Sequence, residues 1–216
     1  MRARRQPGGA RRDQIARAVL ALAAERGMSA VSVAAVAARV GVSPPALYRH
    51  YPSKDAMLDA TLERMGETVL ANLERTRTEG GDPLEALARL FERHVDVVRE
   101  SRGLPLLILS EDFVHDPRRR RRLLAMMGAF RAEIERLVRA AQAAGRVRAG
   151  LDPATLSLMF FGLFQAPAIL WHLTGCRSDL TGHARRGWAV FHDAIRAGDV
   201  RPAAPRRRAR AKEKPA

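Results

Sequence analysis

The chain of 216 residues has a formal net charge of +15 and 47% apolar residues, so it can form a real hydrophobic core and is not a disordered polymer. Its single cysteine, Cys176, excludes an intrachain disulfide and fits a reducing compartment. So basic a chain favours a polyanionic partner.

The positive charge is concentrated at the two ends of the chain. Residues 1–12 contain five arginines and no acid, and residues 201–216 contain five arginines and two lysines against one glutamate. We expect a flexible basic arm over residues 1–12 and a disordered basic tail over residues 198–216. DNA is the expected polyanion, with a solubilising or membrane-surface role as the alternative.

The first predicted helix follows the arm. An arginine-rich start followed by apolar residues 18–24 imitates an export signal, but Arg17 and Glu25 bracket a short run with helical patterning. Its apolar stripe can cover a neighbouring helical unit that is too small to bury a core alone. The stripe consists of Ile15, Ala18, Val19 and Leu22.

The stretch SVAAVAARVGVSPPALYRHYPSK, residues 32–54, has the pattern of two short helices joined by a tight turn. Ser32 is a good N-cap for the first helix, and Gly41 allows the left-handed turn that ends it. Ser43 then caps a second helix, which has two prolines in its first turn and continues to Tyr51. A helix, a glycine turn and a second helix are the signature of a helix-turn-helix.

Side chains that suit DNA contacts gather on this second helix and just after it. Tyr48, Arg49 and His50 fan outward and Lys54 follows at the next helix start, which supplies hydroxyl, guanidinium, imidazole and ammonium groups. The prolines offer no hydrogen bond to base edges, so thymine methyl contacts, Tyr48 and Arg49 must carry much of the base reading. A structural helical hairpin with solvated charges is the alternative. The candidate DNA-binding residues are Ser32, Ser43, Pro44, Pro45, Ala46, Tyr48, Arg49, His50 and Lys54.

A set of spaced residues connects these features: Gly27, Ser32, Val36, Ala37, Gly41, Val42, Ser43, Leu47, Tyr48, His50, Tyr51, Ser53, Lys54 and Leu58. With them, residues 27–58 resemble the DNA-binding domain of the TetR family of bacterial transcriptional regulators. Val40 stands where that family usually has a small residue, and Tyr51 where it usually has phenylalanine. The resemblance implies a helix-turn-helix DNA-binding domain over residues 13–58. After residue 60 it covers helix order and length only.

The second half of the chain, residues 59–197, has the pattern of a helical bundle. One helix runs from Ser53 past residue 70 and joins the two halves. Aspartate followed by proline, an N-cap and N1 pair, then opens three helices at residues 82, 116 and 152. We also expect a short helix over residues 104–114 and a last one over residues 180–197. No strand pattern competes, so the predicted fold is all-α, with a C-terminal helical bundle for ligand binding and dimerisation.

Bulky apolar residues are concentrated in this second domain. They come from several helices, which is how a bundle lines a pocket for an apolar ligand. Ordinary core packing explains them equally well. The pocket candidates are Phe91, His94, Phe113, Met126, Phe130, Met159, Phe160 and Phe164.

Residues 154–176 form an uncharged run that is long enough to cross a membrane. Polar residues within it and arginines on both sides argue against that interpretation. A helix that is apolar all round must instead be covered all round, by the core on one side and by a second subunit on the other. The candidate interface residues are Gly162, Ala166, Trp188, Phe191 and Ile195, and the resemblance implies a four-helix dimer contact there.

Three further patterns could indicate a partner-binding, metal or catalytic site, and for each we favour a simpler structural explanation. Residues 118–122 are five arginines that we expect on a solvated face, with an acidic partner as the alternative. His172 and Cys176 lack the paired ligands of a structural zinc site, so no metal is predicted. Polar residues near Ser110 come without a nucleophile or phosphate-loop motif, so neither catalytic residues nor cofactors are expected.

These features predict a cytoplasmic, homodimeric, ligand-responsive transcriptional regulator, and favour a repressor. Its expected partners are a double-stranded DNA operator, a small apolar effector and a second copy of itself, without a membrane. The resemblance implies that effector binding shifts the helices that connect the pocket to the reading heads. The alternative is an architectural or nucleoid-associated DNA-binding protein of the same fold without an effector.

Overall fold

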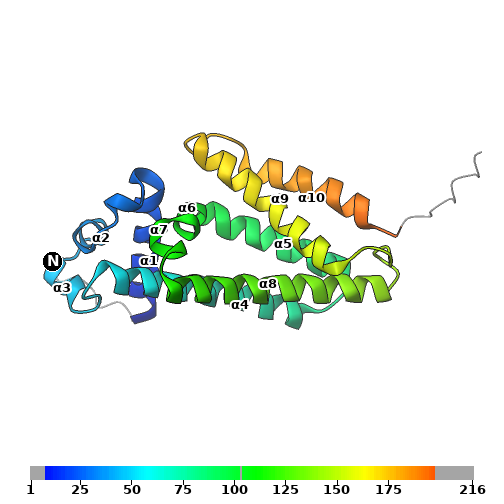
Figure 1. Cartoon of the computed structure of the whole chain (residues 1–216), viewed down its shortest axis with the longest axis horizontal. Coiled ribbons are helices and arrows are strands. Elements are labelled where there is room, and N and C mark those ends of the chain that lie inside the picture. Colours follow the sequence, from blue (N-terminus) through cyan, green and yellow to red (C-terminus); the bar gives the residue numbers. More distant parts are fainter. Residues whose placement is uncertain (1–7, 103, 198–216) are drawn as a thin grey trace, which may run out of the picture.

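A computed structural model describes residues 8–102 and 104–197 of the chain. Over these residues the chain is helical and contains no strand (Figure 1), which confirms the predicted all-α fold. The helices are α1 (Gly8–Arg26), α2 (Val33–Val40), α3 (Pro44–Tyr48), α4 (Lys54–Glu79), α5 (Pro83–Glu100), α6 (Leu104–Leu109), α7 (Glu111–Val114), α8 (Pro117–Ala143), α9 (Pro153–Leu173) and α10 (Leu180–Ile195), with a short 3-10 helix at Met28–Ala30.

The three aspartate-proline pairs begin helices as predicted. The Asp82 carboxylate accepts hydrogen bonds from the first backbone N–H groups of α5, and Asp116 and Asp152 do the same for α8 and α9. Each carboxylate satisfies donors that have no partner within the helix, and the following proline has no N–H to satisfy. These helix starts are therefore fixed by neighbouring residues in the sequence.

Three predicted boundaries differ from the structure. Helix α1 already begins at Gly8, so residues 8–12 are helical instead of a flexible arm, while residues 1–7 and 198–216 lie outside the described residues. The helix expected over residues 104–114 breaks at Ser110, whose hydroxyl donates to the Leu107 carbonyl at 2.7 Å and so competes with the helix. Helix α3 ends at Tyr48, three residues earlier than predicted.

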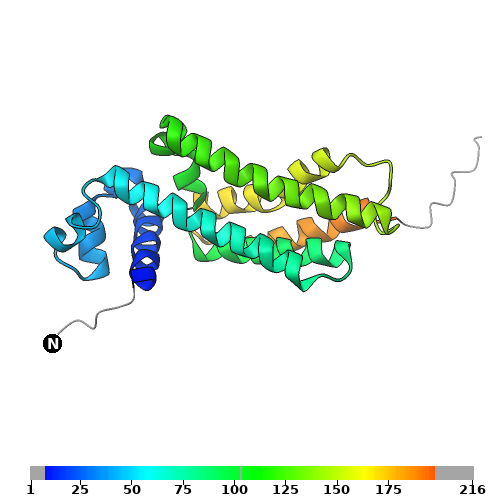
Figure 2. The same ribbon diagram turned by 90° about the horizontal axis from the view of Figure 1, so that it is seen from below.

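Two hydrophobic cores lie along the molecule, and α4 extends from one to the other. The N-terminal core combines α1, α2, α3 and the start of α4, and it also includes Leu107 of α6 and Phe113 of α7, which are both 0% exposed. The C-terminal core combines α5, α8, α9 and α10 with Val69 and Leu73 of α4. Figure 2 shows α4 and α8 side by side along the molecule. The two domains are therefore joined by a shared helix and by side chains that cross between them.

A buried arginine holds the start of α8 against the start of α4. Arg119 is 4% exposed and donates to the carboxylates of Asp55 at 2.7 Å and Asp59 at 2.8 Å, and to the Asp112 carbonyl at 3.0 Å. Burial alone would lower the pKa of Arg119, but these two carboxylates outweigh burial and raise the pKa. The prediction that all five arginines of residues 118–122 are solvated is thus wrong for Arg119 and holds for the other four, which are exposed.

Candidate DNA-binding surface and effector cavity

The predicted helix-turn-helix is present, and its turn has the expected geometry. The Ser32 hydroxyl accepts from the Ala35 N–H at 3.1 Å and caps α2. Gly41 ends α2 in the left-handed conformation, with φ 75° and ψ 36°, where a residue with a Cβ atom is strained. Ser43 stands at the N-cap of α3 but its side chain makes no capping hydrogen bond. The turn therefore positions α3 through backbone geometry and through the buried Leu47.

The candidate DNA contacts of α3 form an exposed surface at one end of the molecule. The Tyr48 side chain is 48% exposed, and Arg49 and His50 are exposed beside it. Among the described residues, none of these three side chains makes a hydrogen bond or an ion pair. Figures 1 and 2 show α3 at the end of the molecule opposite the C-terminal bundle. Ser43, Pro44 and Pro45 are also exposed on this surface, and Ala46 is half-buried.

Lys54 differs from the other candidates because it has partners within the chain. Its ammonium group donates to Asp112 at 3.0 Å and to the Met28 carbonyl at 3.4 Å. Asp112 lies on α7, so this ion pair joins the N-terminal unit to the second domain. Sequence reasoning placed Lys54 with the phosphate contacts because the partner is 58 residues away in the chain.

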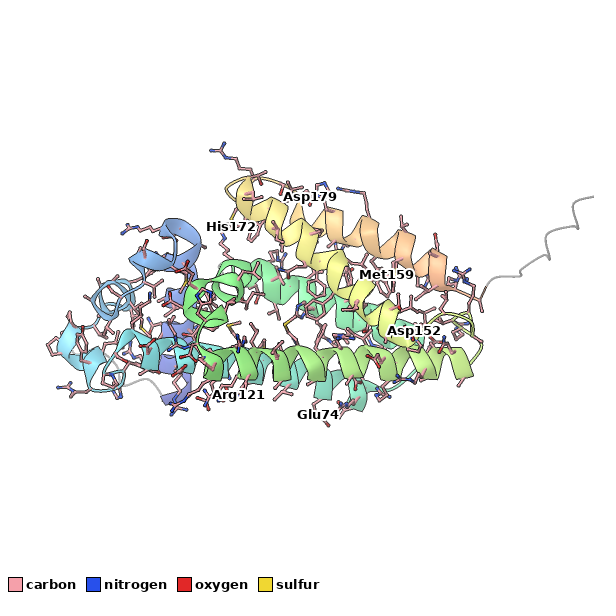
Figure 3. The ribbon with its side chains drawn as sticks, in the orientation of Figure 1. Glu74, Arg121, Asp152, Met159, His172 and Asp179 are labelled. Atoms are coloured by element: carbon pink, nitrogen blue, oxygen red, sulfur yellow. The ribbon has the colours of Figure 1, made fainter. Side chains whose placement is uncertain are left out.

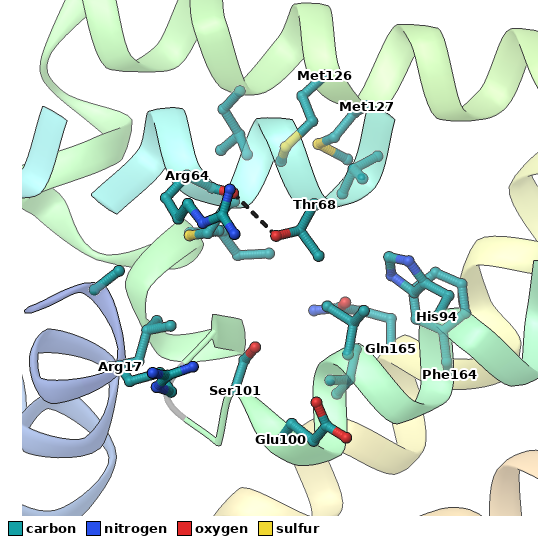
Figure 4. A pocket seen from close by; sticks show the side chains of 18 of the residues that line it. Arg17, Arg64, Thr68, His94, Glu100, Ser101, Met126, Met127, Phe164 and Gln165 are labelled. Carbon is teal, nitrogen blue, oxygen red and sulfur yellow. Dashed lines mark hydrogen bonds between the residues drawn. The ribbon is translucent and has the colours of Figure 1, made fainter. Parts of the chain in front are cut away.

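A cavity of about 220 Å³ lies where α1 meets α4, α5, α8 and α9 (Figure 4). Three of the pocket candidates, His94, Met126 and Phe164, line it. The other pocket candidates lie elsewhere: Phe91, Phe130 and Phe160 fill the C-terminal core, Phe113 belongs to the N-terminal core, and Met159 is 52% exposed on the outer side of α9. Only part of the predicted pocket set therefore lines the cavity, and the cavity lies closer to α1 than that set predicts.

Helix α1 contributes residues to this cavity that sequence reasoning missed. Arg17 and Leu20 line it from α1, Thr68 from α4 and Gln165 from α9. The sequence predicts the first helix only as a cover for the helix-turn-helix, because its apolar spacing gives no signal of a second contact surface. An occupant of the cavity would therefore touch both the N-terminal unit and the second domain.

His94 is an uncharged polar group within the apolar wall of the cavity. Its ring centroid lies 4.2 Å from that of Phe164 and 4.6 Å from that of Phe130. Burial among these rings lowers the pKa of His94 from 6.5 to about 4. At neutral pH the imidazole is therefore uncharged, with one nitrogen that donates and one that accepts.

The outer face of α9 and α10 is apolar and exposed in the single chain. Two of the interface candidates, Gly162 and Ala166, are exposed on it, and Leu173 and Val190 are 78% and 71% exposed. Phe191 and Ile195, which were predicted for the same interface, belong instead to the C-terminal core, at 4% and 2% exposed. Trp188 is half-buried because it stacks on Phe91, with ring centroids 5.1 Å apart. The spacing of apolar residues on α10 predicts an apolar stripe, but it does not tell whether the chain's own core or a second subunit covers that stripe.

Helix α9 is long and apolar enough to cross a membrane by length and composition alone. A core helix of a water-soluble protein passes the same test. Phe160, Phe164, Ala168 and Trp171 of α9 pack in the C-terminal core. Figure 3 shows Met159 on α9 and Asp152 at the N-cap that precedes it. Over residues 8–102 and 104–197, no group of three His, Cys, Asp or Glu residues could hold a metal ion.

Two segments of the chain match known protein families. Residues 15–61 match "Bacterial regulatory proteins, tetR family", and residues 80–188 match "Tetracyclin repressor-like, C-terminal domain". The nucleoid occlusion factor SlmA of Haemophilus influenzae is 32% identical over 95 residues, which are 44% of this chain and 44% of that protein. The chain spans about half the length of such curated relatives.

Solved structures share the whole fold at lower identity. The ketosteroid transcriptional regulator KstR2 of Mycobacterium tuberculosis is 20% identical with a TM-score of 0.71, over 90% of this chain and 99% of that chain. The regulator FadR of Bacillus subtilis, in complex with stearoyl-CoA, is 19% identical with a TM-score of 0.67, over 85% and 98%. At these identities the likeness concerns the fold alone.

Proposed function

Because the chain belongs to the TetR family of bacterial regulatory proteins, we propose that it is a cytoplasmic, homodimeric repressor that leaves its operator when a small effector binds. The observation that carries DNA reading is the exposed end surface of α3. Tyr48, Arg49 and His50 are presented there without partners among the described residues, on a unit whose buried core fixes their position. Such groups suit phosphates and base edges in a major groove.

Dimerisation is proposed through the apolar outer face of α9 and α10. Exposed Leu173 and Val190 would lose contact with water there, and Gly162 would allow a partner helix to approach closely. A two-fold dimer would present two copies of α3 to successive major grooves of a pseudo-palindromic operator. Affinity then depends on both copies binding together.

Release by an effector is proposed through the cavity beside α1. Its occupant would contact α1 and α4, both of which support the reading surface. An effector can release DNA only if it binds the released arrangement more tightly than the DNA-bound one. The FadR complex with stearoyl-CoA supports the proposal, because this fold accommodates an acyl ligand in that protein.

A nucleoid-associated function is the second candidate, since the relative with 32% identity over 95 residues is a nucleoid occlusion factor. In that case the chain would bind DNA without release by an effector. Salt and sequence dependence separate non-specific binding from operator recognition, because non-specific binding rests on counterion release and shows little preference among duplexes.

The test is a titration of the duplex directly upstream of the protein's own coding sequence against a scrambled duplex of equal composition. We expect preferential binding, and Tyr48→Ala should weaken it by about 1–3 kcal/mol without loss of helical content. Leu70→Ala is the matched control, since Leu70 is 56% exposed on α4 and away from the end surface. Equal affinity for both duplexes, or an unchanged Tyr48→Ala variant, would contradict operator reading by α3.

A further inference from the structure

Several polar side chains of the cavity beside α1 make no hydrogen bond among the described residues: Arg17, Glu100 and Ser101 towards its rim, and Gln165 of α9 and His94 of α5 among the apolar residues. Figure 4 shows the Gln165 amide directed into the open space, with His94 of α5 nearby. Polar groups in a mostly apolar wall usually pair with a ligand or with water.

The charged residues of the lining do not favour an ionic occupant. Arg17 and Arg64 are opposed by Asp13 and Glu100, so the charges of the lining sum to zero. Arg64 is already paired, with Asp13 and with Glu67. His94 adds no charge at neutral pH, because burial lowers its pKa to about 4. Arg17 and Glu100 make no ion pair among the described residues, but both are exposed, so water solvates their charges at the rim of the cavity. An ion held deeper, beside His94 and Phe164, would lose hydration without gaining a buried counter-charge.

The remaining lining is adaptable and apolar. Met65, Met126 and Met127 contribute flexible thioether side chains, and Leu20 of α1 and Phe161 of α9 add further apolar side chains. The volume of about 220 Å³ exceeds the roughly 150 Å³ of an engineered cavity that binds benzene. It therefore suits a body of about eight to ten heavy atoms.

We propose that this cavity binds a neutral amphiphile, with an unbranched or cyclic apolar body and one hydroxyl, carbonyl or amide group hydrogen-bonded by Gln165 and His94. The proposal names the ligand class of the effector site, and it rests on the proposed function only for the consequence on DNA. The proposed binding of the ligand rests only on the cavity and its lining. Because Leu20 and Arg17 belong to α1, the ligand would contact the N-terminal unit directly as well as through α4.

Three probes with one carbon skeleton test the ligand class: 1-octanol, octanoate and octylammonium. We expect calorimetry on the full chain at neutral pH to show octanol binding at least about tenfold more tightly than either ion. Gln165→Leu and His94→Phe, which keep volume and remove polarity, should each weaken octanol binding by about threefold to tenfold, the range for one neutral hydrogen bond. The matched control is Leu70→Ala, which leaves the cavity untouched and should bind octanol like the wild type.

Each outcome of this experiment decides the proposal. Octanoate or octylammonium binding as tightly as octanol would overturn it, as would octanol affinity that Gln165→Leu and His94→Phe leave unchanged, or no octanol binding up to its solubility. Circular dichroism establishes that both variants are folded. The titrations contain no DNA, so octanol binding with no operator preference would retain this ligand class and reject the regulatory function. Operator preference without octanol binding would do the reverse.

Discussion

Replacing the buried Arg119 guanidinium, which lies between the two domains, tests how firmly the N-terminal DNA-reading unit (α1 to the start of α4) is fixed to the C-terminal bundle. Arg119→Met keeps most of the aliphatic stem near Phe113, whose ring centroid is 5.9 Å from the guanidinium carbon, and removes every hydrogen bond. The side chain donates to two carboxylates and to two backbone carbonyls, those of Asp112 and Asp55. All of these contacts join α8 to α4 or to α7.

The magnitude follows from the exposure of the partners. Breaking a fully buried ion pair costs about 3–5 kcal/mol because an uncompensated charge stays buried. Here the carboxylates of Asp55 and Asp59 are 72% and 46% exposed, so water can solvate them after the substitution. The Asp112 carbonyl loses a charged donor, a loss of about 1.5–3 kcal/mol. We expect a destabilisation of about 2 kcal/mol, which lowers Tm by about 4–8 °C for a chain of this size.

Arg121→Met is the matched control, because Arg121 is exposed in the same run of arginines and lies on the outer side of α8 in Figure 3. It should change stability by less than about 0.5 kcal/mol. Thermal unfolding followed by circular dichroism, at equal protein concentration for all variants, measures both. Equal Tm shifts for the two variants, or a shift below about 1 °C for Arg119→Met, would refute the role of Arg119 as a joint.

Three more substitutions probe assembly, the turn and the cavity. Gly162→Arg should give a folded chain, because a Cβ atom at Gly162 meets nothing within 4 Å in the single chain, but it should block the dimer contact and so greatly weaken operator binding. The control is Gly128→Arg on α8, where a Cβ atom is equally unobstructed. In sedimentation Gly162→Arg should be a monomer and Gly128→Arg a dimer. Gly41→Ala should destabilise the protein by about 1 kcal/mol in thermal unfolding, because the residue has φ 75°. In the unfolded chain His94 binds a proton below about pH 6.5, whereas in the folded chain burial delays protonation until about pH 4. The free energy of unfolding should therefore fall by about 3 kcal/mol as the pH is lowered across that window, and His94→Phe should reduce this fall.

Contrary results would be specific. A dimeric Gly162→Arg variant would move the interface away from the middle of α9. A Gly41→Ala variant as stable as the wild type would mean that the turn relaxes without strain. Acid destabilisation that persists unchanged in His94→Phe would assign that pH dependence to other groups.

Local signals predicted most helices, whereas contacts between distant residues escaped prediction. Asp82 and its two equivalents start helices through adjacent backbone groups, so the sequence alone locates them. Arg119 looked like one of five equal charges, because its partners Asp55 and Asp59 are 64 and 60 residues away. Phe191 showed an apolar stripe on α10, and periodicity does not reveal whether a stripe meets its own core or another subunit. The position of the cavity differs from the prediction for the same reason, because the contact between α1 and the bundle forms only in the folded chain.

Leu107 and Phe113 complete the N-terminal core although they follow the helix-turn-helix by about fifty residues in the chain. During synthesis from the N-terminus, the reading unit therefore lacks two of its fully buried side chains until α7 has left the ribosome. The same dependence limits recombination between genes. A fusion that joins residues 1–61 to the effector domain of another regulator would inherit a reading unit with two holes in its core, unless the new partner supplied apolar side chains at the same places.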